Sequence, residues 1–464
     1  MSDVLVYKFG GTSLEGADRI ERALQLAQEA TERGSGVVLV ASAMGATTDT
    51  LHELSTAAPD TGAGDAATIR RLIKRHQAVA RQLCSGAVLS ACLAAIDAVG
   101  VELGEQVAAL RPWRSSPAAT TAATTAAILS TGERLSTRVI AAAASERGFA
   151  ATLVDARQLI RTNGDHLEAT VDRPATAQLL SAGARPSAGE LVVMQGFLGA
   201  TADGTTTTLG RGGSDYTASL VGAALAATEV VIWTDVDAVM TCDPKVVPDA
   251  RPLAQLSYRV AAELAYCGAA VLHPQTIGPA VEAGTPVRVR NPHLGSGPGT
   301  IIHAGGDHRG PAAIAFKQGI TVVNVTSSRM LDNYGFLRRI FATFEAHRTS
   351  VDLVTTSEVS VSMTIDDESA LPAIVADLEQ IGTVTVEQRQ AIVSMVGDGL
   401  LEADDVLANA ATAINGTPVT LLSLGASDVN LSLVVPDAAS NHTVRALHHA
   451  LLDMQPQLKK ETFR

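Results

Sequence analysis

The pattern that most restricts the fold lies at the start of the chain. Residues 4–9 form a short apolar run with a lysine near its end, and two glycines follow it. Apolar side chains then recur at i, i+3, i+4 and i+7 over residues 20–27, which is typical of the buried face of a helix. Residues 37–43 are continuously apolar or small, as expected for a strand buried on both faces. Strand, helix and strand in this order predict a βαβ unit of a parallel sheet.

Later apolar runs repeat the strand pattern. Residues 191–197, 230–234 and 287–289 each predict another strand, and Asp203-Gly204 is placed as a hairpin turn between two extended stretches. The sequence therefore predicts an α/β fold with a parallel-rich sheet between helices.

The segment 51–128 has a different composition. It is rich in Ala and Leu at helical spacing and has few strand signals, so we expect a helical insertion. Within it, residues 115–127 form a low-complexity run rich in Thr and Ala, which predicts a surface linker or a loosely packed helix start.

After about residue 305 the order of elements changes. We expect βαββαβ over 320–325, 336–347, 351–355, 359–364, 371–380 and 384–386. A second series of strand, helix, two strands and helix is expected over 391–396, 404–414, 419–422, 429–435 and 441–452. Two such copies predict paired ferredoxin-like modules, with a Gly- and Pro-rich boundary at 295–311.

Charge and cysteine content exclude several classes of protein. The 464 residues carry a net charge of −13, which disfavours partnership with nucleic acid or an anionic membrane. The four cysteines form no CxxC pair or Cys/His cluster, so we expect no metal site built from protein ligands and a reducing, cytoplasmic location. The N-terminus lacks a basic signal-peptide region, and we predict no transmembrane helix, because the longest strongly apolar stretch found, 219–227, is short.

The first glycine-rich turn is typical of phosphate binding. Lys8 precedes Gly10 and Gly11 at a strand end, and a helix begins just beyond. Glycines let backbone N–H groups approach an anion, the helix N-terminus adds a partial positive charge, and the lysine adds a full one. An ordinary strand–helix turn with a solvated lysine fits the same residues.

The second glycine-rich turn, LGRGGSD at residues 209–215, runs into a predicted helix at 216–227. Arg211 could hold a carboxylate or a phosphate through two parallel hydrogen bonds. Asp215 could cap the helix, face a magnesium ion or orient Lys8. The motif matches neither GxGxxG nor GxxxxGK[ST], which disfavours the Rossmann and P-loop folds.

Three further motifs place polar residues near strand ends or helix starts. Ser42 and Thr48 follow the second predicted strand, at the sheet edge where open α/β folds bind ligands. Thr234 and Asp235 leave another strand and could bind a ribose or an adenine, although such turns are common. Glu133, in TGERLS, by itself is typical of an exposed helix start.

Together, these motifs resemble the aspartate kinases. The segments that carry the resemblance occur in the family's order over about residues 4–302: KFGGTS, SAMG-x-TTD, TGERLS, TTLGRGGSDYTA, WTDVDAVMTCDPKVVPDA and GAAVLHPQT. The tail, including 335–337 and 350–358, is similar to the paired ACT domains of that family, and the insertion is similar to its longer, lysine-sensitive type. The domains implied are an amino-acid kinase domain at 1–305 with its insertion at 51–128, one ACT domain at 318–388, and a second at 306–317 plus 389–464.

The resemblance implies ATP-dependent phosphorylation of the β-carboxylate of L-aspartate to 4-phospho-L-aspartate, with Mg²⁺ as cofactor. This is the first step of the aspartate-family amino acid pathway. The nucleophile is already ionised at pH 7, so the reaction needs positioning and charge stabilisation rather than a general base. The lack of a convincing catalytic His or Cys agrees with this chemistry.

The functional residues of the family map onto this sequence motif by motif. Lys8 and Asp215 would be catalytic, with Lys8 bridging the transferred phosphoryl group. Arg211 would hold the α-carboxylate of aspartate, and Glu133 its ammonium. The other aspartate contacts would be Ser42, Thr48 and Ser214. The ATP site would comprise Lys8, Gly10, Gly11, Gly213, Thr234, Asp235, Met240 and Lys245.

Three residues depart from the family pattern, all on the nucleotide side. Ala270 stands where a lysine is usual, Lys245 where an arginine is common, and Met240 where an aromatic residue is usual. We therefore predict weaker or altered use of the nucleotide and an unchanged acceptor.

The resemblance also implies regulation by an amino acid. The lysine-site pattern of the longer type matches Met330, Gly335, Leu337, Val351, Asp352, Thr356 and Ser357. Lysine is the simplest effector and threonine an alternative; Asp352 could pair with the effector's ammonium or merely cap a turn. Asn333 stands where the pattern has a small hydroxyl residue, so a changed effector stays open. ACT pairing implies a homodimer or a tetramer.

Two other functions stay open at this point. One is a diverged paralogue that phosphorylates a related amino-acid carboxylate, although Glu133 and Arg211 disfavour an acceptor without an amino group or an α-carboxylate. The other is a catalytically weak regulatory subunit that binds amino acids. Ala270 supports that reading, and the intact Lys8 and Asp215 oppose it.

Overall fold

The computed structural model describes residues 3–56, 63–110, 119–267, 274–293, 297–305, 309–330, 334–400, 402–403, 405–425 and 427–453. The chain divides into two compact units. The first comprises Met1–Val239, Ala254–Leu256 and Val271–Ala304, and the second comprises Met240–Leu253, Ser257–Ala270 and Gly305–Arg464.

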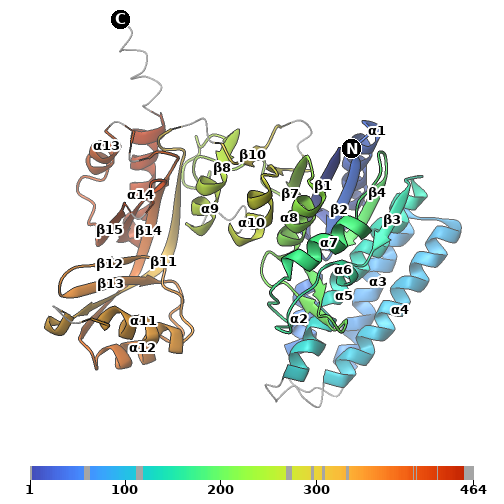
Figure 1. Cartoon of the computed structure of the whole chain (residues 1–464), viewed down its shortest axis with the longest axis horizontal. Coiled ribbons are helices and arrows are strands. Elements are labelled where there is room, and N and C mark those ends of the chain that lie inside the picture. The colour runs from blue at the N-terminus through green and yellow to red at the C-terminus, as the bar shows by residue number, and fades with distance from the viewer. Residues whose placement is uncertain are drawn as a thin grey trace, which may run out of the picture. The chain divides into compact units, whose positions relative to one another are not determined.

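The described part of the first unit is built on an eight-stranded sheet in the order β3-β4-β2-β1-β7-β9-β10-β8 (Figure 1). Its strands are β1 (Val4–Phe9), β2 (Gly36–Ala41), β3 (Ala151–Val154), β4 (Leu191–Gln195), β7 (Glu229–Trp233), β8 (Gln255–Ser257), β9 (Val287–Arg290) and β10 (Thr300–His303). The strands from β3 to β9 in this order are parallel, and β10 is antiparallel to β9. A hairpin of β5 (Leu198–Ala200) and β6 (Thr206–Thr208) contains the predicted turn at Asp203-Gly204.

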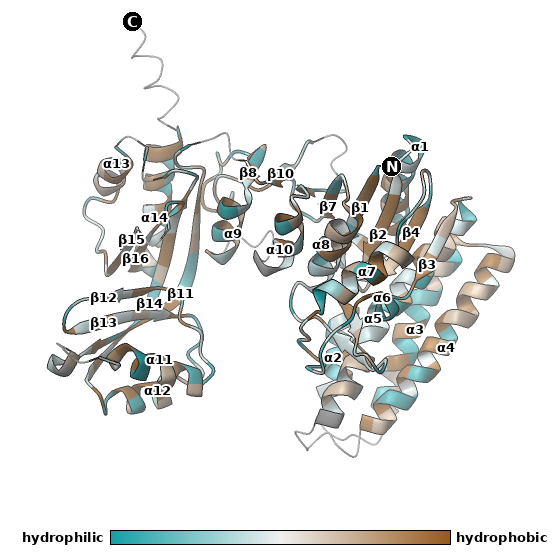
Figure 2. Cartoon of the chain, in the orientation of Figure 1, coloured by the Kyte–Doolittle hydropathy of each residue, from teal (hydrophilic) through white to brown (hydrophobic). Residues whose placement is uncertain are grey.

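Helices cover both faces of this sheet. Alternate residues of β1 point to opposite faces, so Tyr7 and Phe9 enter a core shared with helices α1 and α5, whereas Lys8 faces helix α8. Because both faces are covered, β2 and β4 are buried along their whole length and are mostly apolar, as the brown ribbon in Figure 2 shows. The helices that lie wholly or mostly outside the insertion are α1 (Ala17–Glu32), α5 (Ala119–Glu146), α6 (Ala156–Leu159), α7 (Arg173–Gly183), α8 (Gly213–Leu225) and α10 (Pro274–Ala283).

The described residues of the predicted insertion are helical. They form α2 (Thr47–Thr56), α3 (Ala63–Leu83), α4 (Gly86–Leu110) and the first turns of α5. Of the two alternatives for the Thr/Ala run, a helix start is confirmed and a linker is wrong from Ala119 onward, because the alanines continue as a regular helix. Residues 115–118 lie outside the described residues.

Helix α4 is the one described helix long and apolar enough, by length and composition, to cross a membrane. This stretch is longer than 219–227, so the expectation that 219–227 is the longest strongly apolar stretch is wrong. The helix is weak evidence for a membrane span, because core helices pass the same test. One face of α4, including Ile96, Val99 and Leu103, is buried in the apolar core that also contains α3 and α5 residues.

The described part of the second unit is built on a six-stranded antiparallel sheet in the order β12-β13-β11-β14-β16-β15. Its strands are β11 (Ala313–Thr326), β12 (Val354–Thr356), β13 (Ser360–Ile365), β14 (Thr383–Val396), β15 (Leu421–Leu424) and β16 (Asn430–Pro436). Its helices are α9 (Tyr258–Tyr266), α11 (Phe336–Ala346), α12 (Leu371–Leu378), α13 (Val406–Ala413) and α14 (Asp437–His448), followed by one π-helical turn at His449–Asp453.

Two long strands connect the ferredoxin-like modules. The strands expected at 384–386 and 391–396 are one continuous strand, β14, which pairs along β11 through a register shift. The first module uses one half of each long strand with β12 and β13, and the second uses the other half with β15 and β16. The predicted α/β fold class with two βαββαβ modules is confirmed.

Candidate active site

The candidate site lies where the parallel strands end. The carboxyl ends of β1, β2, β4 and β7 share one edge of the sheet, because these strands run in the same direction. The chain leaves that edge at residues 10–11, 42–43, 196–197 and 234–235, which include predicted site residues. Open α/β sheets bind ligands at this edge.

Lys8 and Asp215 form the central ion pair of the site. The Lys8 Nζ is 2.7 Å from Asp215 Oδ1, and the two side chains are 11% and 18% exposed. Lys8 is the penultimate residue of β1, on the face covered by α8, and Asp215 lies in the first turn of α8. Gly10 lies beside the lysine, since a Cβ added there would come within 3.7 Å of Nζ. The arrangement leaves a partly buried ammonium at a helix N-terminus, as anion binding requires.

Gly11 allows two neighbouring strand ends to approach closely. A Cβ at Gly11 would lie 2.8 Å from the carbonyl oxygen of Ala43, so a larger residue would push the segments apart. The Gly11 carbonyl also accepts a 2.9 Å hydrogen bond from the Gly45 N–H. The two small-residue turns after β1 and β2 are thus held together by backbone contacts.

Glu133 is buried in this site. Its side chain is on α5, and its Oε1 accepts a 3.0 Å hydrogen bond from the Ala43 N–H, while Oε2 has no partner among the described residues. Burial raises the pKa of the Glu133 carboxyl to about 8. A lone Glu at an exposed helix start, the alternative open from the sequence, is wrong because the residue is only 3% exposed. A cationic group beside Oε2 would complete the site electrostatically.

The rest of the TGERLS motif docks α5 against the end of β2. A Cβ at Gly132 would lie 2.7 Å from that of Ala43, so glycine allows the close approach. The Ser136 hydroxyl donates a 2.8 Å hydrogen bond to the Ser42 carbonyl. Thr48 lies in the first turn of α2, half-buried, one residue after the buried Thr47.

The LGRGGSD turn is packed against the end of β4. A Cβ at Gly196 would lie 2.6 Å from Ser214, and one at Gly213 would lie 2.8 Å from the Phe197 ring. Phe197 has φ of +69°, a left-handed conformation that costs energy for a residue other than glycine. Its N–H donates to Thr217 Oγ1 at 3.1 Å, which helps to hold it there. Such strain is typical of functional sites.

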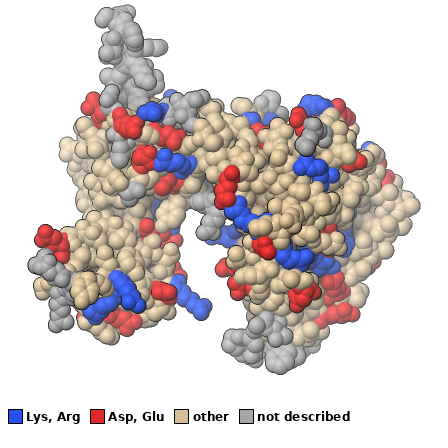
Figure 3. All heavy atoms as spheres, in the orientation of Figure 1, with Lys and Arg blue, Asp and Glu red and all other residues tan. Residues whose placement is uncertain are grey.

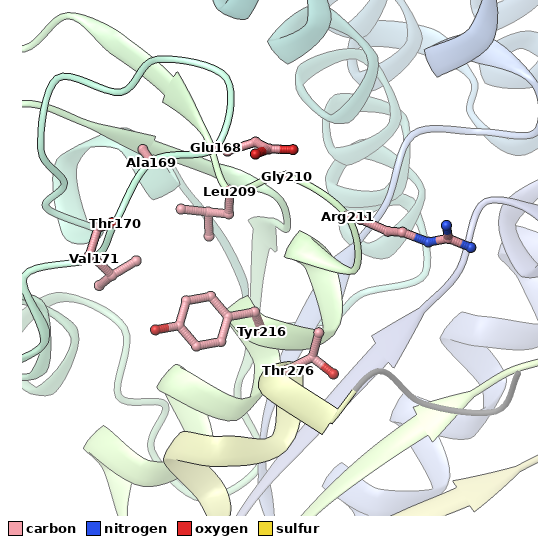
Figure 4. A pocket seen from close by; sticks show the side chains of 9 residues that line it. All are labelled: Glu168, Ala169, Thr170, Val171, Leu209, Gly210, Arg211, Tyr216 and Thr276. Carbon is pink, nitrogen blue, oxygen red and sulfur yellow. The ribbon is translucent and has the colours of Figure 1, made fainter. Parts of the chain in front are cut away.

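Arg211 borders an open cavity of about 490 Å³ in the first unit (Figure 4). The guanidinium of Arg211 is exposed and extends away from the other lining side chains. Hydroxyl groups of Thr170, Tyr216 and Thr276 and the carboxylate of Glu168 make the lining polar. Arg211 lies four residues before Asp215 at the same helix start, so the chain brings it near the Lys8–Asp215 pair.

Thr234 and Asp235 follow β7 at the same sheet edge. The Thr234 hydroxyl donates a 3.1 Å hydrogen bond to Asp235 Oδ1, and Asn291 Nδ2 donates to the Asp235 carbonyl at 3.2 Å. The preceding Trp233 stacks on Phe9 with ring centroids 5.9 Å apart and lies under the guanidinium of Arg290. The residue that precedes this turn, Trp233, is thus held by stacking on a buried aromatic ring.

Two other residues predicted to contact the nucleotide do not belong to the first unit. Met240 and Lys245 belong to the second unit, where Lys245 is exposed and Met240 is half-buried. Ala270 lies outside the described residues.

Acidic and basic side chains are interspersed over both units on the face drawn in Figure 3.

Comparison with known proteins identifies the family. Residues 3–291 match the model of the amino acid kinase family, and residues 323–376 and 393–451 match an ACT domain. The chain is 37% identical to Aspartokinase 3, chloroplastic, of Arabidopsis thaliana, over 97% of this chain and 81% of that protein. This chain belongs to the aspartokinases. The Lysine-sensitive aspartokinase 3 of Escherichia coli is also 37% identical, over 72% of this chain and 77% of that one.

Solved aspartokinases share the fold over nearly the whole chain. E. coli aspartokinase III in complex with aspartate and ADP (R-state) has a TM-score of 0.81 at 31% identity and covers 97% of this chain and 100% of its own. The complex of E. coli aspartokinase III with lysine and aspartate (T-state) gives 0.82 at the same identity and coverage.

The predicted effector residues of this aspartokinase all lie in its first ACT module. Met330 and Val351 pack against one apolar cluster, Gly335 caps α11 with φ of +87°, and Leu337 is exposed in the first turn of that helix. Thr356 ends β12, and Ser357 Oγ is 2.7 Å from Ser360 Oγ in the following turn. Asn333 lies outside the described residues.

Asp352 makes contacts that the sequence did not predict. Its Oδ2 lies 3.4 Å from Lys317 Nζ, and its Oδ1 accepts a 3.2 Å hydrogen bond from the Tyr266 hydroxyl. Lys317 also pairs with Asp366. Burial raises the pKa of the Asp352 carboxyl, against the opposing effect of Lys317. The carboxylate of Asp352, which is expected to bind an effector, is thus already paired with side chains of the protein itself.

Sequence reasoning missed several residues around the candidate site. Ser136, Gly196 and Phe197 were not selected, although a glycine directly after a buried strand was a usable signal for the latter pair. Glu168 belongs to none of the recognised motifs and Thr276 ends the GAAVLHPQT motif, and both come to the cavity only through the tertiary fold.

Proposed function

We propose that this aspartokinase transfers the γ-phosphoryl group of ATP to the β-carboxylate of L-aspartate, forming 4-phospho-L-aspartate and ADP. The observation that carries the proposal is the buried Glu133: its Oε2 has no partner among the described residues, and its Oε1 bonds the Ala43 N–H just after β2, the strand that pairs with Lys8's strand. A buried carboxylate with a free oxygen is complementary to a substrate ammonium. The named ligands of E. coli aspartokinase III, aspartate and ADP, agree with this acceptor and donor.

The roles of the chain's own residues follow from their charges. Arg211 would bind the α-carboxylate of aspartate while Glu133 binds its ammonium, so that the β-carboxylate is left as the nucleophile. Lys8 would stabilise the negative charge on the phosphoryl group as its bond to ADP breaks and its bond to the carboxylate forms. The phosphoryl transfer itself moves no proton, because the nucleophile is already ionised; positioning and charge stabilisation carry the catalysis.

Magnesium would enter with the nucleotide as part of the MgATP substrate. Among the described residues, no group of three or more His, Cys, Asp and Glu side chains could hold a metal ion. Asp215 fits a more limited role, because its carboxylate is partly exposed beside Lys8 and oxygen ligands suit Mg²⁺. When bound, the ion would neutralise phosphate charge.

The second unit would provide regulation. We propose lysine as the effector, with Asp352 receiving its ammonium, and a homodimer or tetramer assembled through the ACT modules. Support comes from the lysine complex of E. coli aspartokinase III and from the first-module location of the predicted effector residues. Threonine would be the alternative effector. The four buried, free cysteines are consistent with a reducing cytoplasm.

A hydroxamate assay with aspartate and MgATP tests the proposed reaction, because hydroxylamine traps acyl phosphates. We expect product with the wild-type chain and loss of product with Lys8→Ala. Product only with another amino-acid carboxylate would establish a diverged acceptor, and no product with any acceptor would overturn the kinase assignment. A fall in the KM for ATP in Ala270→Lys would support the proposed nucleotide-side weakness.

A further inference from the structure

Gln195, the last residue of β4, lies between two helices of the first unit. Its side chain is 2% exposed, and both ends of its amide are hydrogen-bonded. Oε1 accepts a 2.8 Å hydrogen bond from the N–H of Ala156, the first residue of α6, and Nε2 donates at 3.0 Å to the hydroxyl of Thr137 on α5. Because Oε1 receives an N–H, the orientation of the amide is determined. No step of the proposed reaction uses this buried side chain.

The hydrogen bond from Gln195 to Thr137 continues to the backbone of Glu133. The Thr137 hydroxyl is fully buried and donates at 2.7 Å to the Glu133 carbonyl, one helical turn earlier. The end of β4 is therefore connected by hydrogen bonds to the residue whose carboxylate has a free oxygen. Removing one partner from a buried network of this kind leaves a polar group unsatisfied, so the network favours a single arrangement of α5 against β4.

The residues directly after Gln195 contact the opposite side of the aspartate site. A Cβ added at Gly196 would lie 2.6 Å from Ser214, so the chain passes close to the LGRGGSD turn. The Phe197 N–H donates at 3.1 Å to Thr217 Oγ1, and Thr217 lies on α8, the helix that follows this turn. The end of β4 thus contacts α5 through the Gln195 side chain and the LGRGGSD turn through its backbone.

An α-amino acid needs the two sides of this site at one separation. Its ammonium and its α-carboxylate are attached to the same carbon atom, so the groups that bind them must be held in a fixed relation. In the proposed function these groups are Glu133, on α5, and Arg211, in the LGRGGSD turn. The end of β4 is in contact with both of these segments.

We propose that Gln195 is a positioning residue for the amino-acid acceptor: by bonding Thr137 it holds Glu133 where the carboxylate can bind the ammonium of aspartate. The inference rests on the proposed function for the role of Glu133. Every residue that it uses lies in the first unit. Lys8 and Asp215 have no share in this chain of hydrogen bonds, so the transfer of the phosphoryl group should change little once the acceptor is bound.

Conservative variants separate the hydrogen bonds from the volume of the side chains. Thr137→Val removes the hydroxyl, Thr137→Ser keeps it, and Gln195→Met replaces the amide by an apolar chain of similar length. We expect Thr137→Val and Gln195→Met to raise the KM for aspartate about fivefold or more in the hydroxamate assay. Their kcat should stay within about twofold of wild type, because the interaction affected is one of acceptor binding. Thr137→Ser should restore the KM to within about twofold of wild type.

A matched control separates this effect from general damage. Thr176 on α7 is 1% exposed, and its hydroxyl accepts a 3.0 Å hydrogen bond from the Arg161 N–H, away from α5. Thr176→Val therefore removes an equally buried hydroxyl; it should lower the melting temperature and leave the KM for aspartate unchanged. The KM for MgATP should change in none of these variants.

The double variant tests whether Gln195 and Thr137 act through one interaction. Gln195→Met combined with Thr137→Val should raise the KM for aspartate no more than Gln195→Met alone, because the first change already breaks the hydrogen bond that the second removes. Effects that multiply would show that the two residues act independently and would contradict the inference. Where Gln195→Met does not fold, the comparison of Thr137→Val with Thr137→Ser and Thr176→Val decides the question.

The outcomes distinguish this inference from the proposed function. An unchanged KM for aspartate in folded Thr137→Val and Gln195→Met, or an equal rise in Thr176→Val, would overturn the role of Gln195 and leave the kinase assignment intact. An equal rise in the KM values for aspartate and MgATP would overturn it as well. Wild-type protein that forms no product would contradict the proposed function, and the Kd for aspartate, measured by calorimetry in the same variants, would still test Gln195.

Discussion

The ammonium of Lys8 lies 2.7 Å from the carboxylate of Asp215, although 207 positions separate the two residues in the chain. Parallel pairing of β1 with β2 and β7 places the lysine at the centre of the sheet edge, and α8 brings the aspartate over it. The ion pair thus holds the Lys8 ammonium at the sheet edge, where a phosphate group could also bind it.

Lys8→Ala should therefore lower kcat by about 10²–10³, because a charge that stabilises the transferred phosphoryl group is lost. The remaining Asp215 would be left half-buried without a cation, so a lower melting temperature is expected as well. Lys74→Ala, which removes an exposed lysine of α3, serves as the control and should change neither quantity. Equal kcat values for Lys8→Ala and wild type would contradict the assigned role.

The buried Glu133 predicts a proton coupled to substrate binding. Burial raises the pKa of this carboxyl from its ordinary value of 4.5 to about 8, so the substrate-free protein holds the proton at pH 7. The ammonium of aspartate favours the ionised form, and binding at pH 7 should then release up to about one proton. Calorimetry in buffers of different ionisation enthalpy measures this release. Binding enthalpies that do not vary with the buffer would contradict it.

The same pKa shift has a consequence for stability. A raised pKa in the folded state contributes stability that is fully present below pH 4.5 and is lost as the pH rises through about 8. Glu133→Gln cannot ionise, so its melting temperature relative to wild type should increase between pH 5 and pH 8.5. A constant difference across this range would show that Glu133 ionises normally. Activity with aspartate should fall in this variant at every pH.

Much of the sheet edge was predictable from local sequence. Continuous apolar runs identified β1, β2, β4 and β7, and glycine-rich motifs marked the turns after β1 and before α8. Because parallel strands share one edge, the motifs after their ends could be expected to converge. The short, partly exposed β3 gave too weak a signal and was missed.

Other features depend on contacts between distant segments and have no local signature. The left-handed Phe197 is supported by the Thr217 hydroxyl, and Asp352 receives Tyr266 and Lys317 from other elements. The continuity of β14 was also missed, because the exposed polar residues 387–389 interrupt its apolar pattern, whereas the strand pairs with β11 on both sides of a register shift. Register and side-chain partners of this kind are set by tertiary packing.

Gly132 and Gly104 provide a matched test of the packing between α5 and β2. Both lie within helices, but a Cβ at Gly132 would come 2.7 Å from the Cβ of Ala43, whereas one at Gly104 would meet nothing within 4 Å. Gly132→Ala should destabilise the protein by about 1–3 kcal/mol through overpacking and should raise the KM for aspartate by moving Glu133. Gly104→Ala should stabilise it by about 0.5–1 kcal/mol through helix propensity. Chemical denaturation measures both, and destabilisation of equal size would refute the steric argument.

The contacts of Asp352 predict opposite effects for two substitutions on effector sensitivity. Lys317 lies 3.4 Å from the carboxylate and competes with an incoming ammonium, so Lys317→Met should lower the lysine concentration that gives half-maximal inhibition. Asp352→Asn removes the charge that would attract lysine and should raise that concentration about tenfold or more. Arg309→Met, which breaks an exposed ion pair with Glu402 in the same unit, is the control and should have little effect. Activity without lysine should be similar in all three variants, and a shift of the first two in the same direction would show that Lys317 and the effector do not compete for Asp352.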